Sequence, residues 1–199
     1  MIAALLPPGL SGAELRDTGQ KLDLHPGEEH HVARAAEKRR RDFSLGRSCA
    51  RAALAPLGHG EAAISMGADG APQWPSGILG SITHTSRYAA AVAGEANFFL
   101  GVGVDAERVG GVTHKLWPRL FNEAEQAHLA GRIDADVAAT LLFSAKEAAF
   151  KAWRLRGALA FRDIAIALQE DGFTADHAGK QLRGRHAVEG ELVLTLAWF

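Results

Sequence analysis

The sequence of 199 residues has a single cysteine, no long hydrophobic run and no excess of charge of either sign. Cys49 has no second cysteine with which to form a disulfide within the chain. Its apolar neighbours Ala50 and Ala53 favour a small buried residue over a reactive thiol. No stretch approaches the roughly 18 consecutive apolar residues that a membrane-spanning helix needs.

The absence of a charge excess also limits the partners. A net charge of -1 argues against a broad basic surface for nucleic acid. The first ten residues are apolar, but they carry no leading positive charge and Pro7-Pro8-Gly9 interrupts them, which is not typical of a signal peptide. We therefore expect a cytoplasmic monomer without a transmembrane segment and without a nucleic-acid partner.

The composition is that of a globular protein, with 47% hydrophobic and 23% charged residues. After a strand predicted at residues 1–6, a long helical stretch covers residues 28–57, and strands are expected at residues 64–66, 78–82 and 88–93. A second long helix is expected at residues 136–156, with strands at residues 161–168 and 192–198. This repeated order predicts an α+β fold of two similar subdomains, residues 1–104 and 105–199, each with a long helix on a mainly antiparallel sheet.

The chain is organised around residues 143–153, within the second long helix. Four alanines, at positions 145, 148, 149 and 152, form a small-residue stripe that can pack closely on a neighbouring layer. Glu147 and Lys151, at i and i+4, share a different face. Taken alone, this pair is most often a surface ion pair worth a few tenths of a kcal/mol.

A buried strand at residues 98–105 makes this pair more informative. It ends on Asp105, and Glu107 points to the same side because side chains alternate along a strand. Two crowded carboxylates repel each other unless a cation lies between them. Together with Glu147 they offer three hard oxygen ligands, which suits Mg²⁺ bound jointly with substrate phosphates.

Five sequence blocks together resemble one family. Residues 80–85 (GSITHT), 101–107 (GVGVDAE) and 143–153 (FSAKEAAFKAW) resemble the 4′-phosphopantetheinyl transferases that modify carrier proteins of siderophore and other non-ribosomal peptide synthetases. Residues 43–47 (FSLGR) and 72–77 (PQWPSG) extend the resemblance to the enterobactin-synthetase type. Each block alone is weak, but all five occur in the family's order.

The resemblance implies a function, a fold and a set of ligands. A member of this family transfers 4′-phosphopantetheine from coenzyme A to a serine of an apo peptidyl or acyl carrier protein and releases 3′,5′-ADP. Its two pseudo-symmetric halves hold the active site in the cleft between them. The first half would then bind the phosphates and adenine of coenzyme A, and the second would carry the metal and the catalytic helix.

The resemblance also implies roles for individual residues. Mg²⁺ would be held by Asp105, Glu107 and Glu147; Glu147 would be the base, a ligand or both, and Lys151 would stabilise the departing 3′,5′-ADP. The residues expected to contact coenzyme A are Arg40, Arg47, Trp74, Thr83, His84, Lys146 and Lys151. Lys146 lies about 100° around the helix from Glu147 and is expected to contact phosphate or carrier protein. Lys115 and Arg119, with the apolar Leu120 and Phe121, are candidate carrier-docking residues.

The sequence allows two other interpretations. Residues 101–106 match the dinucleotide pattern G-x-G-x-x-G/A, but the residues that follow are a poor helix start. The chain could also be a non-catalytic module that binds coenzyme A or nucleic acid through its basic helix. Neutral net charge and the lack of an aromatic stacking platform disfavour the nucleic-acid version.

Overall fold

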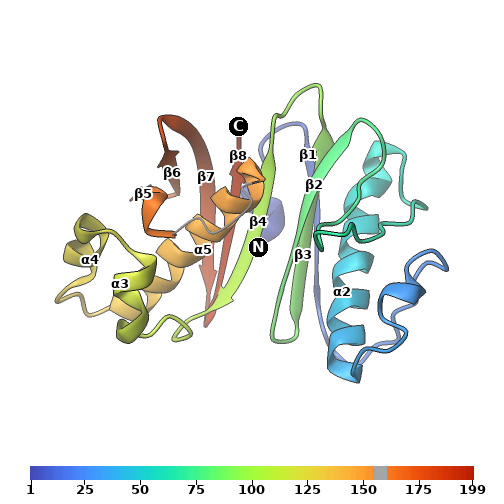
Figure 1. The fold of residues 1–199 in the computed structure, drawn as a ribbon, viewed down its shortest axis with the longest axis horizontal. Coiled ribbons are helices and arrows are strands. Elements are labelled where there is room, and N and C mark those ends of the chain that lie inside the picture. Colours follow the sequence, from blue (N-terminus) through green and yellow to red (C-terminus); the bar gives the residue numbers. More distant parts are fainter. Residues whose placement is uncertain (155–160) are drawn as a thin grey trace. The chain divides into compact units, whose positions relative to one another are not determined.

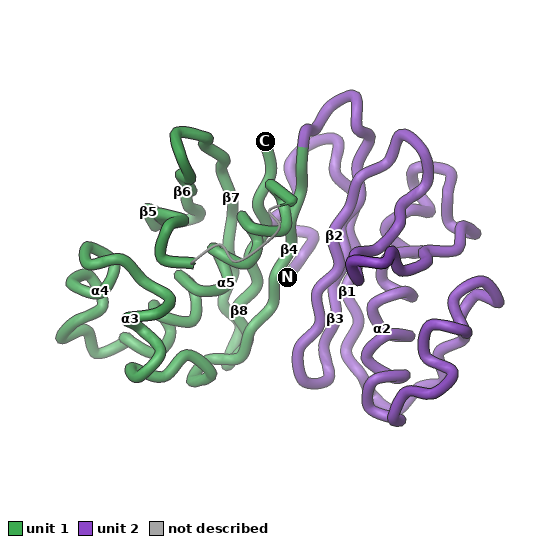
Figure 2. The backbone as a smooth tube through the Cα atoms, in the orientation of Figure 1, with its two compact units in different colours: residues 1, 101–199 green, residues 2–100 purple. Residues whose placement is uncertain are grey.

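The fold consists of two compact units. A computed structural model describes residues 1–154 and 161–199. One unit comprises Ile2–Leu100, and the other comprises Gly101–Phe199 together with Met1 (Figure 2). In each unit a long helix packs on an antiparallel sheet (Figure 1). This arrangement confirms the predicted α+β class.

The N-terminal unit, residues 2–100, has a three-stranded sheet in the order β1-β3-β2. Its elements are α1 (Ile2–Leu5), β1 (Leu10–Arg16), η1 (Glu29–His31), α2 (Glu37–Leu54), η2 (Ala55–Leu57), β2 (Ile78–Thr85) and β3 (Tyr88–Glu95). The central strand β3 pairs with both neighbours and is buried along residues 88–94. The helix α2 packs against this sheet.

Small side chains allow α2 to lie close to β3. Cys49, Ala50 and Ala53 are completely buried in the same cluster as the alanines of β3. The Cys49 thiol donates a hydrogen bond to the Ala89 carbonyl at 3.4 Å, and burial raises the pKa of this thiol to about 12. A thiol with this pKa stays protonated at neutral pH. Cys49 is therefore a packing residue, as the sequence predicts.

The start of the chain differs from the prediction. The strand predicted at residues 1–6 is wrong, because Ile2–Leu5 form helix α1 and the first strand is β1. Gly12 of β1 leaves room for this helix, since a methyl group there would lie 3.0 Å from Leu6 Cδ2. Pairing of β1 with β3 along its full length outweighs the weak strand propensity of a segment that contains serine and glycine.

The long helix predicted at residues 28–57 is also divided. A 3-10 turn precedes α2, which begins only at Glu37. The completely buried Glu28 carboxylate accepts hydrogen bonds from the backbone N–H groups of His25 and Ile64 and pairs with Arg51 at 2.6 Å. These bonds fold the preceding segment back across the unit. The strand predicted at residues 64–66 is reduced to one bridge, between Met66 and Pro72.

The C-terminal unit has a five-stranded sheet in the order β4-β8-β7-β6-β5. Its first elements are β4 (Val102–Arg108), η3 (His114–Leu116), α3 (Trp117–Leu120), α4 (Glu123–Leu129) and α5 (Ala135–Trp153). The remaining elements are η4 (Phe161–Asp163), β5 (Ala165–Leu168), β6 (Gly172–His177), β7 (Lys180–Glu189) and β8 (Leu192–Trp198). The described part of α5 ends at Trp153; the end predicted at Arg156 and Gly157 lies outside the described residues.

The helix α5 packs on β4 and β8 through its stripe of alanines. The side chains at positions 145, 148, 149 and 152 are all completely or almost completely buried. Opposite them, a methyl group at Gly103 would clash with the Ala148 carbonyl oxygen, and one at Gly101 with the Ala152 carbonyl oxygen. The predicted close packing of this stripe is therefore confirmed, and Gly103 of β4 and Gly101, just before the strand, make it possible.

We expect Gly103→Ala to destabilise the protein by about 1–3 kcal/mol, because the added methyl group meets helix backbone, which cannot rotate away. Urea unfolding of the full chain measures this loss. Gly111→Ala is the control, since its nearest described neighbour would be 3.4 Å from the new methyl group. Equal stability of the two variants would contradict close packing of α5 on β4.

The last strand is more buried than predicted. Every residue of β8 is buried. Its leucines and Trp198 alternate strictly with the residues beside them, including Glu191 and Thr195, and this pattern predicts a half-buried strand. The strand lies between β4 and β7, and the face that carries Thr195 meets α5. The hydroxyl of Thr195 is 2.9 Å from that of Ser144, so this polar side chain is satisfied within the core. The hairpin of β6 and β7 was not predicted.

Candidate active site

Asp105 and Glu107 lie on the face of β4 that α5 covers. They pair with Thr195 and Val193 of β8, and they lie on the same face of β4 as Gly103, which α5 approaches closely. Asp105 is only 4% exposed, whereas Glu107 is partly buried. The alternation of the strand thus directs both carboxylates toward the helix.

The helix α5 supplies Glu147 and Lys151 to the same place. The Lys151 ammonium donates a hydrogen bond to Asp105 Oδ1 at 2.7 Å and another to the Val104 carbonyl at 3.1 Å. Glu147 lies one turn earlier and is partly buried. Lys151 of α5 thus forms an ion pair with Asp105 of β4. The spacing of Glu147 and Lys151, taken alone, suggests instead a surface ion pair within the helix.

The three carboxylates influence one another electrostatically. Burial, together with the negative charges of Asp105 and Glu147, raises the pKa of Glu107 to about 7, although the positive charge of Lys151 opposes the shift. Burial also raises the pKa of Glu147; Lys151 lowers it and Asp105 raises it. Such repulsion between buried acids is relieved when a cation enters.

The donor set suits a magnesium ion that keeps part of its water shell. Within the described ranges, no group of three His, Cys, Asp or Glu residues converges as a ready metal cage. Mg²⁺ usually retains several waters and binds one or two carboxylates together with substrate phosphates. The hard oxygens of Asp105, Glu107 and Glu147 fit this mode of binding.

A separate pocket lies within the N-terminal unit. Its volume is about 700 Å³, and its lining includes Lys21, Leu22, Leu24, Ala35, Arg40 and Ser44. Arg40 is exposed, and among the described residues no ion pair holds its guanidinium. Asp23, Glu29, Glu37 and Arg41 also line the pocket, so its wall is mixed and not uniformly apolar. The guanidinium of Arg40 is the group in it that can bind an anion.

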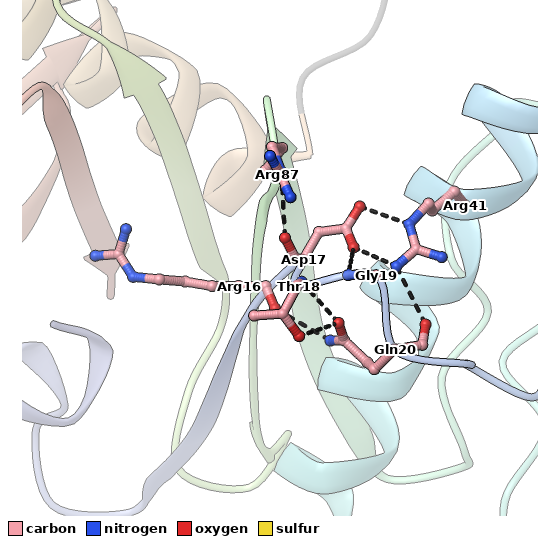
Figure 3. Close-up of polar contacts among 7 residues, drawn as sticks. All are labelled: Arg16, Asp17, Thr18, Gly19, Gln20, Arg41 and Arg87. Carbon is pink, nitrogen blue, oxygen red and sulfur yellow. Dashed lines mark hydrogen bonds and ion pairs between the residues drawn. The ribbon is translucent and has the colours of Figure 1, made fainter.

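The neighbouring Arg41 is engaged within the protein. Its guanidinium forms two bonds with the Asp17 carboxylate and donates to the Gln20 carbonyl at 3.1 Å (Figure 3). Arg87 donates to the Asp17 carbonyl at 3.2 Å. The bond with Arg41 holds the pKa of Asp17 well below its usual range. This network joins the end of β1 to α2 beside the pocket.

Comparison with known proteins identifies the family. Residues 27–94 match the 4′-phosphopantetheinyl transferase N-terminal domain, and residues 101–197 match the 4′-phosphopantetheinyl transferase superfamily. The 4′-phosphopantetheinyl transferase Npt of Nocardia iowensis is 38% identical over 96% of this chain and 87% of its own length. The chain belongs to the 4′-phosphopantetheinyl transferase superfamily.

Other members are similar over most of this transferase. The 4′-phosphopantetheinyl transferase PptT of Mycobacterium tuberculosis is 34% identical over 98% of this chain and 96% of its own length. Enterobactin synthase component D of Escherichia coli K12 is 30% identical over 81% of this chain and 78% of its own length. The resemblance drawn from the five sequence blocks is confirmed.

One predicted ligand contact of the transferase needs correction. Lys146 is completely buried, and its ammonium lies 2.7 Å from Glu125 Oε2, 3.0 Å from the Phe161 carbonyl and 2.5 Å from the Ile164 carbonyl. These three partners use all three N–H donors of the lysine. Lys146 therefore has a structural position rather than the predicted contact with phosphate or carrier protein.

Arg47 of the transferase is buried as well. Its Nε donates to the Ile64 carbonyl at 2.6 Å, and its guanidinium carbon lies 4.2 Å from the centre of the Phe43 ring. Burial lowers the pKa of this guanidinium to about 10; the charge of Glu28 opposes the shift. The described contacts are structural, and the phosphate contact of Arg47 stays a prediction.

The other predicted coenzyme contacts are in the loop before β2 and in β2 itself. The Trp74 indole packs against the core of the N-terminal unit, and a methyl group at Gly80 would come within 2.6 Å of its ring. Thr83 is buried and His84 is exposed near the end of β2. These residues belong to the N-terminal unit and the carboxylates to the other, so their predicted convergence stays a prediction.

Sequence reasoning missed two residues of interest. Lys21 lines the pocket, but it stands in a segment without a recognisable motif. Asn122 followed three residues later by Glu125 is the sequence pattern of a capping box, and both 2.9 Å hydrogen bonds of that motif are present. The capping motif does not indicate the second role of Glu125, as the ion-pair partner of Lys146.

In the part of the chain that is described, no helix is both long and apolar enough to cross a membrane.

Proposed function

We propose that this transferase moves the 4′-phosphopantetheine group of coenzyme A onto a serine of an apo peptidyl or acyl carrier protein. The serine oxygen forms a bond with the β-phosphorus of the diphosphate, and the bond from that phosphorus to the bridging oxygen breaks. The products are the holo carrier protein and 3′,5′-ADP. The observation that carries this proposal is the grouping of Glu147 and Lys151 of α5 with Asp105 and Glu107 of β4, whose charges influence one another.

The carboxylates would serve as metal ligands and as a base. Asp105, Glu107 and Glu147 would hold Mg²⁺, which neutralises negative charge on the diphosphate when it is bound. A carboxylate with a raised pKa is a better proton acceptor near neutral pH than an ordinary one. Partly buried Glu147 fits this description, so it would take the serine proton directly or through a water molecule.

Lys151 would stabilise the leaving group. Its ammonium belongs to the same cluster as the carboxylates and lies on the side of α5 that carries Glu147. A positive charge at this position can offset the charge that develops on the departing 3′,5′-ADP.

The N-terminal unit would bind the coenzyme. In this proposal residues 1–104 hold the phosphates and adenine through Arg40, Arg47, Trp74, Thr83 and His84, and residues 105–199 carry the metal and the chemistry. The pocket of about 700 Å³ beside Arg40 supports a coenzyme-binding role for this unit. Among these residues, Arg40 is exposed and lines the pocket, so its guanidinium is accessible to a phosphate there.

We expect Arg40→Ala to weaken binding of coenzyme A by about tenfold or more, because an arginine–phosphate bond is charge-assisted. Isothermal titration without metal measures the dissociation constant. Arg39→Ala is the matched control: Arg39 is exposed on the same helix but does not line the pocket. If both variants weakened coenzyme A binding equally, the loss of one positive charge on α2 would explain the effect, and a specific contact of Arg40 would be contradicted.

The carrier protein would dock on the segment between β4 and α5. Lys115 and Arg119 are exposed there and can meet an acidic carrier helix. Phe121 is completely buried and Leu120 packs against the core, so the predicted apolar docking residues are structural instead. We propose carriers of siderophore or related non-ribosomal peptide and polyketide synthesis, since enterobactin synthase component D is among the similar proteins.

Mass spectrometry of an apo peptidyl carrier protein tests the proposed function. Incubation with the transferase, coenzyme A and Mg²⁺ should add the mass of one phosphopantetheine to the carrier, and EDTA should prevent the addition. No addition to several peptidyl and acyl carriers, combined with tight binding of coenzyme A, would favour the non-catalytic binding module instead.

A further inference from the structure

Lys151 occupies the carboxylate cluster as an internal cation. Its ammonium is 2.7 Å from Asp105 Oδ1 and 3.1 Å from the Val104 carbonyl, so it sits at the strand that carries the acids. Asp105 is almost completely buried. A buried carboxylate is strongly disfavoured without a cationic partner, and the Lys151 ammonium is such a partner.

The same oxygen is a ligand that a divalent cation would seek. Carboxylate oxygens are the preferred protein ligands of Mg²⁺, and the ammonium holds Oδ1 of Asp105. A divalent cation close to this oxygen would also repel the ammonium, because both are positive. The Lys151 ammonium and a divalent cation would therefore both bind the same buried oxygen, Oδ1 of Asp105.

The side chain of Lys151 is able to leave. It is 29% exposed, while that of Asp105 is 5% exposed. Lysine carries its charge on a flexible four-carbon stem, so the ammonium can move without any movement of α5. Asp105 is fixed in β4, which pairs with β8 along its whole length. Displacement thus requires motion of the lysine and not of the carboxylate.

We infer that a divalent cation and Lys151 compete for Asp105, and that metal binding displaces the ammonium from this carboxylate. The inference rests on the proposed function, and it adds an order to the reaction. Once displaced, the ammonium is available to an anion such as the diphosphate of coenzyme A. Because coupling between two ligands is reciprocal, coenzyme binding should in turn favour metal binding.

Two measurements on the full chain test this inference. The first is Mn²⁺ affinity by electron paramagnetic resonance, in the unmodified protein, in Lys151→Gln and in the matched control Lys180→Gln, which removes an exposed lysine of β7. We expect Lys151→Gln to bind Mn²⁺ about fivefold more tightly and the control to be unchanged. Equal affinity in all three proteins would overturn the inference.

The second measurement separates displacement from a simple change of charge. The unmodified protein is labelled with a small amine-reactive reagent, with and without saturating Mg²⁺, and labelling of Lys151 and Lys180 is read by peptide mass spectrometry. We expect Mg²⁺ to increase labelling of Lys151 several-fold and to leave Lys180 unchanged. Tighter Mn²⁺ binding by Lys151→Gln without any change in labelling would overturn displacement.

Failure of the proposed metal site itself has a different result. If the unmodified protein did not bind Mn²⁺, or bound it as well after Asp105→Asn, the carboxylates would not be metal ligands, and both proposals would fail together. Metal binding that depends on Asp105, combined with unchanged labelling of Lys151, would overturn the competition alone. Because the labelling uses the unmodified protein, it does not depend on the folding of any variant.

Discussion

Glu147→Gln should reduce the turnover of carrier modification by about 10²–10⁴-fold, the range typical for loss of a general base. The amide has the size of the carboxylate but accepts no proton at neutral pH and is a poor Mg²⁺ ligand. The side chain is partly buried among charged neighbours and has a raised pKa, as a proton acceptor would need. Turnover is measured with saturating coenzyme A, Mg²⁺ and an apo carrier protein.

The control for this variant is Glu170→Gln, which removes an exposed carboxylate between β5 and β6. It should leave turnover unchanged. Glu147→Gln should also leave the affinity for coenzyme A in metal-free buffer unchanged, because the proposed contacts of the coenzyme with protein lie elsewhere. If turnover remained close to that of the unmodified protein, Glu147 would take no part in the chemistry.

The residues at the centre of the site were predictable because local geometry determines where they point. Alternation along a strand places Asp105 and Glu107 on one side, and helical spacing places Glu147 one turn from Lys151. The sequence also predicts the small-residue stripe that brings α5 close to β4. Local geometry could not predict the partner of Lys151, because its bond to Asp105 joins residues far apart in the chain.

Lys146 shows why charged residues were harder to assign. Its neighbour Ala145 belongs to the predicted buried stripe, and Leu142 and Ala149 lie on the same side of the helix as the lysine and are buried. That position was a signal for burial. A lysine is nevertheless rarely buried without a partner, and its partner Glu125 could be recognised only as a capping residue.

The strands illustrate the limit set by pairing. Segments with alternating or continuous apolar residues, such as β3 and β8, were predicted. The strand β1 was missed because its position depends on pairing with β3 and not on its own residues. The hairpin of β6 and β7 has charged residues on one face and glycines within it. Its pairing with β8 and the burial of Phe173, Ala175 and Leu182 in the core stabilise it, and both depend on residues far away in the chain.

Lys146→Met should destabilise the protein by about 3–5 kcal/mol, because it leaves the Glu125 carboxylate buried without its cation. The carboxylate would still accept hydrogen bonds from the backbone N–H groups of Asn122 and Ile166, each at 2.9 Å. The lysine bonds to the carbonyls of residues 161 and 164 would be lost as well. Urea unfolding of the full chain measures the change, with Lys180→Met as the exposed control.

The double variant tests the cause of this loss. Glu125→Gln removes the charge that Lys146→Met leaves unpaired, so the two substitutions together should cost less than the sum of the single ones. The pair joins α4, α5 and the start of β5, and a positive coupling energy would mean that the ion pair itself holds these elements together. Additive losses would contradict this, and would mean that the bonds of Lys146 to the two carbonyls account for its contribution to stability.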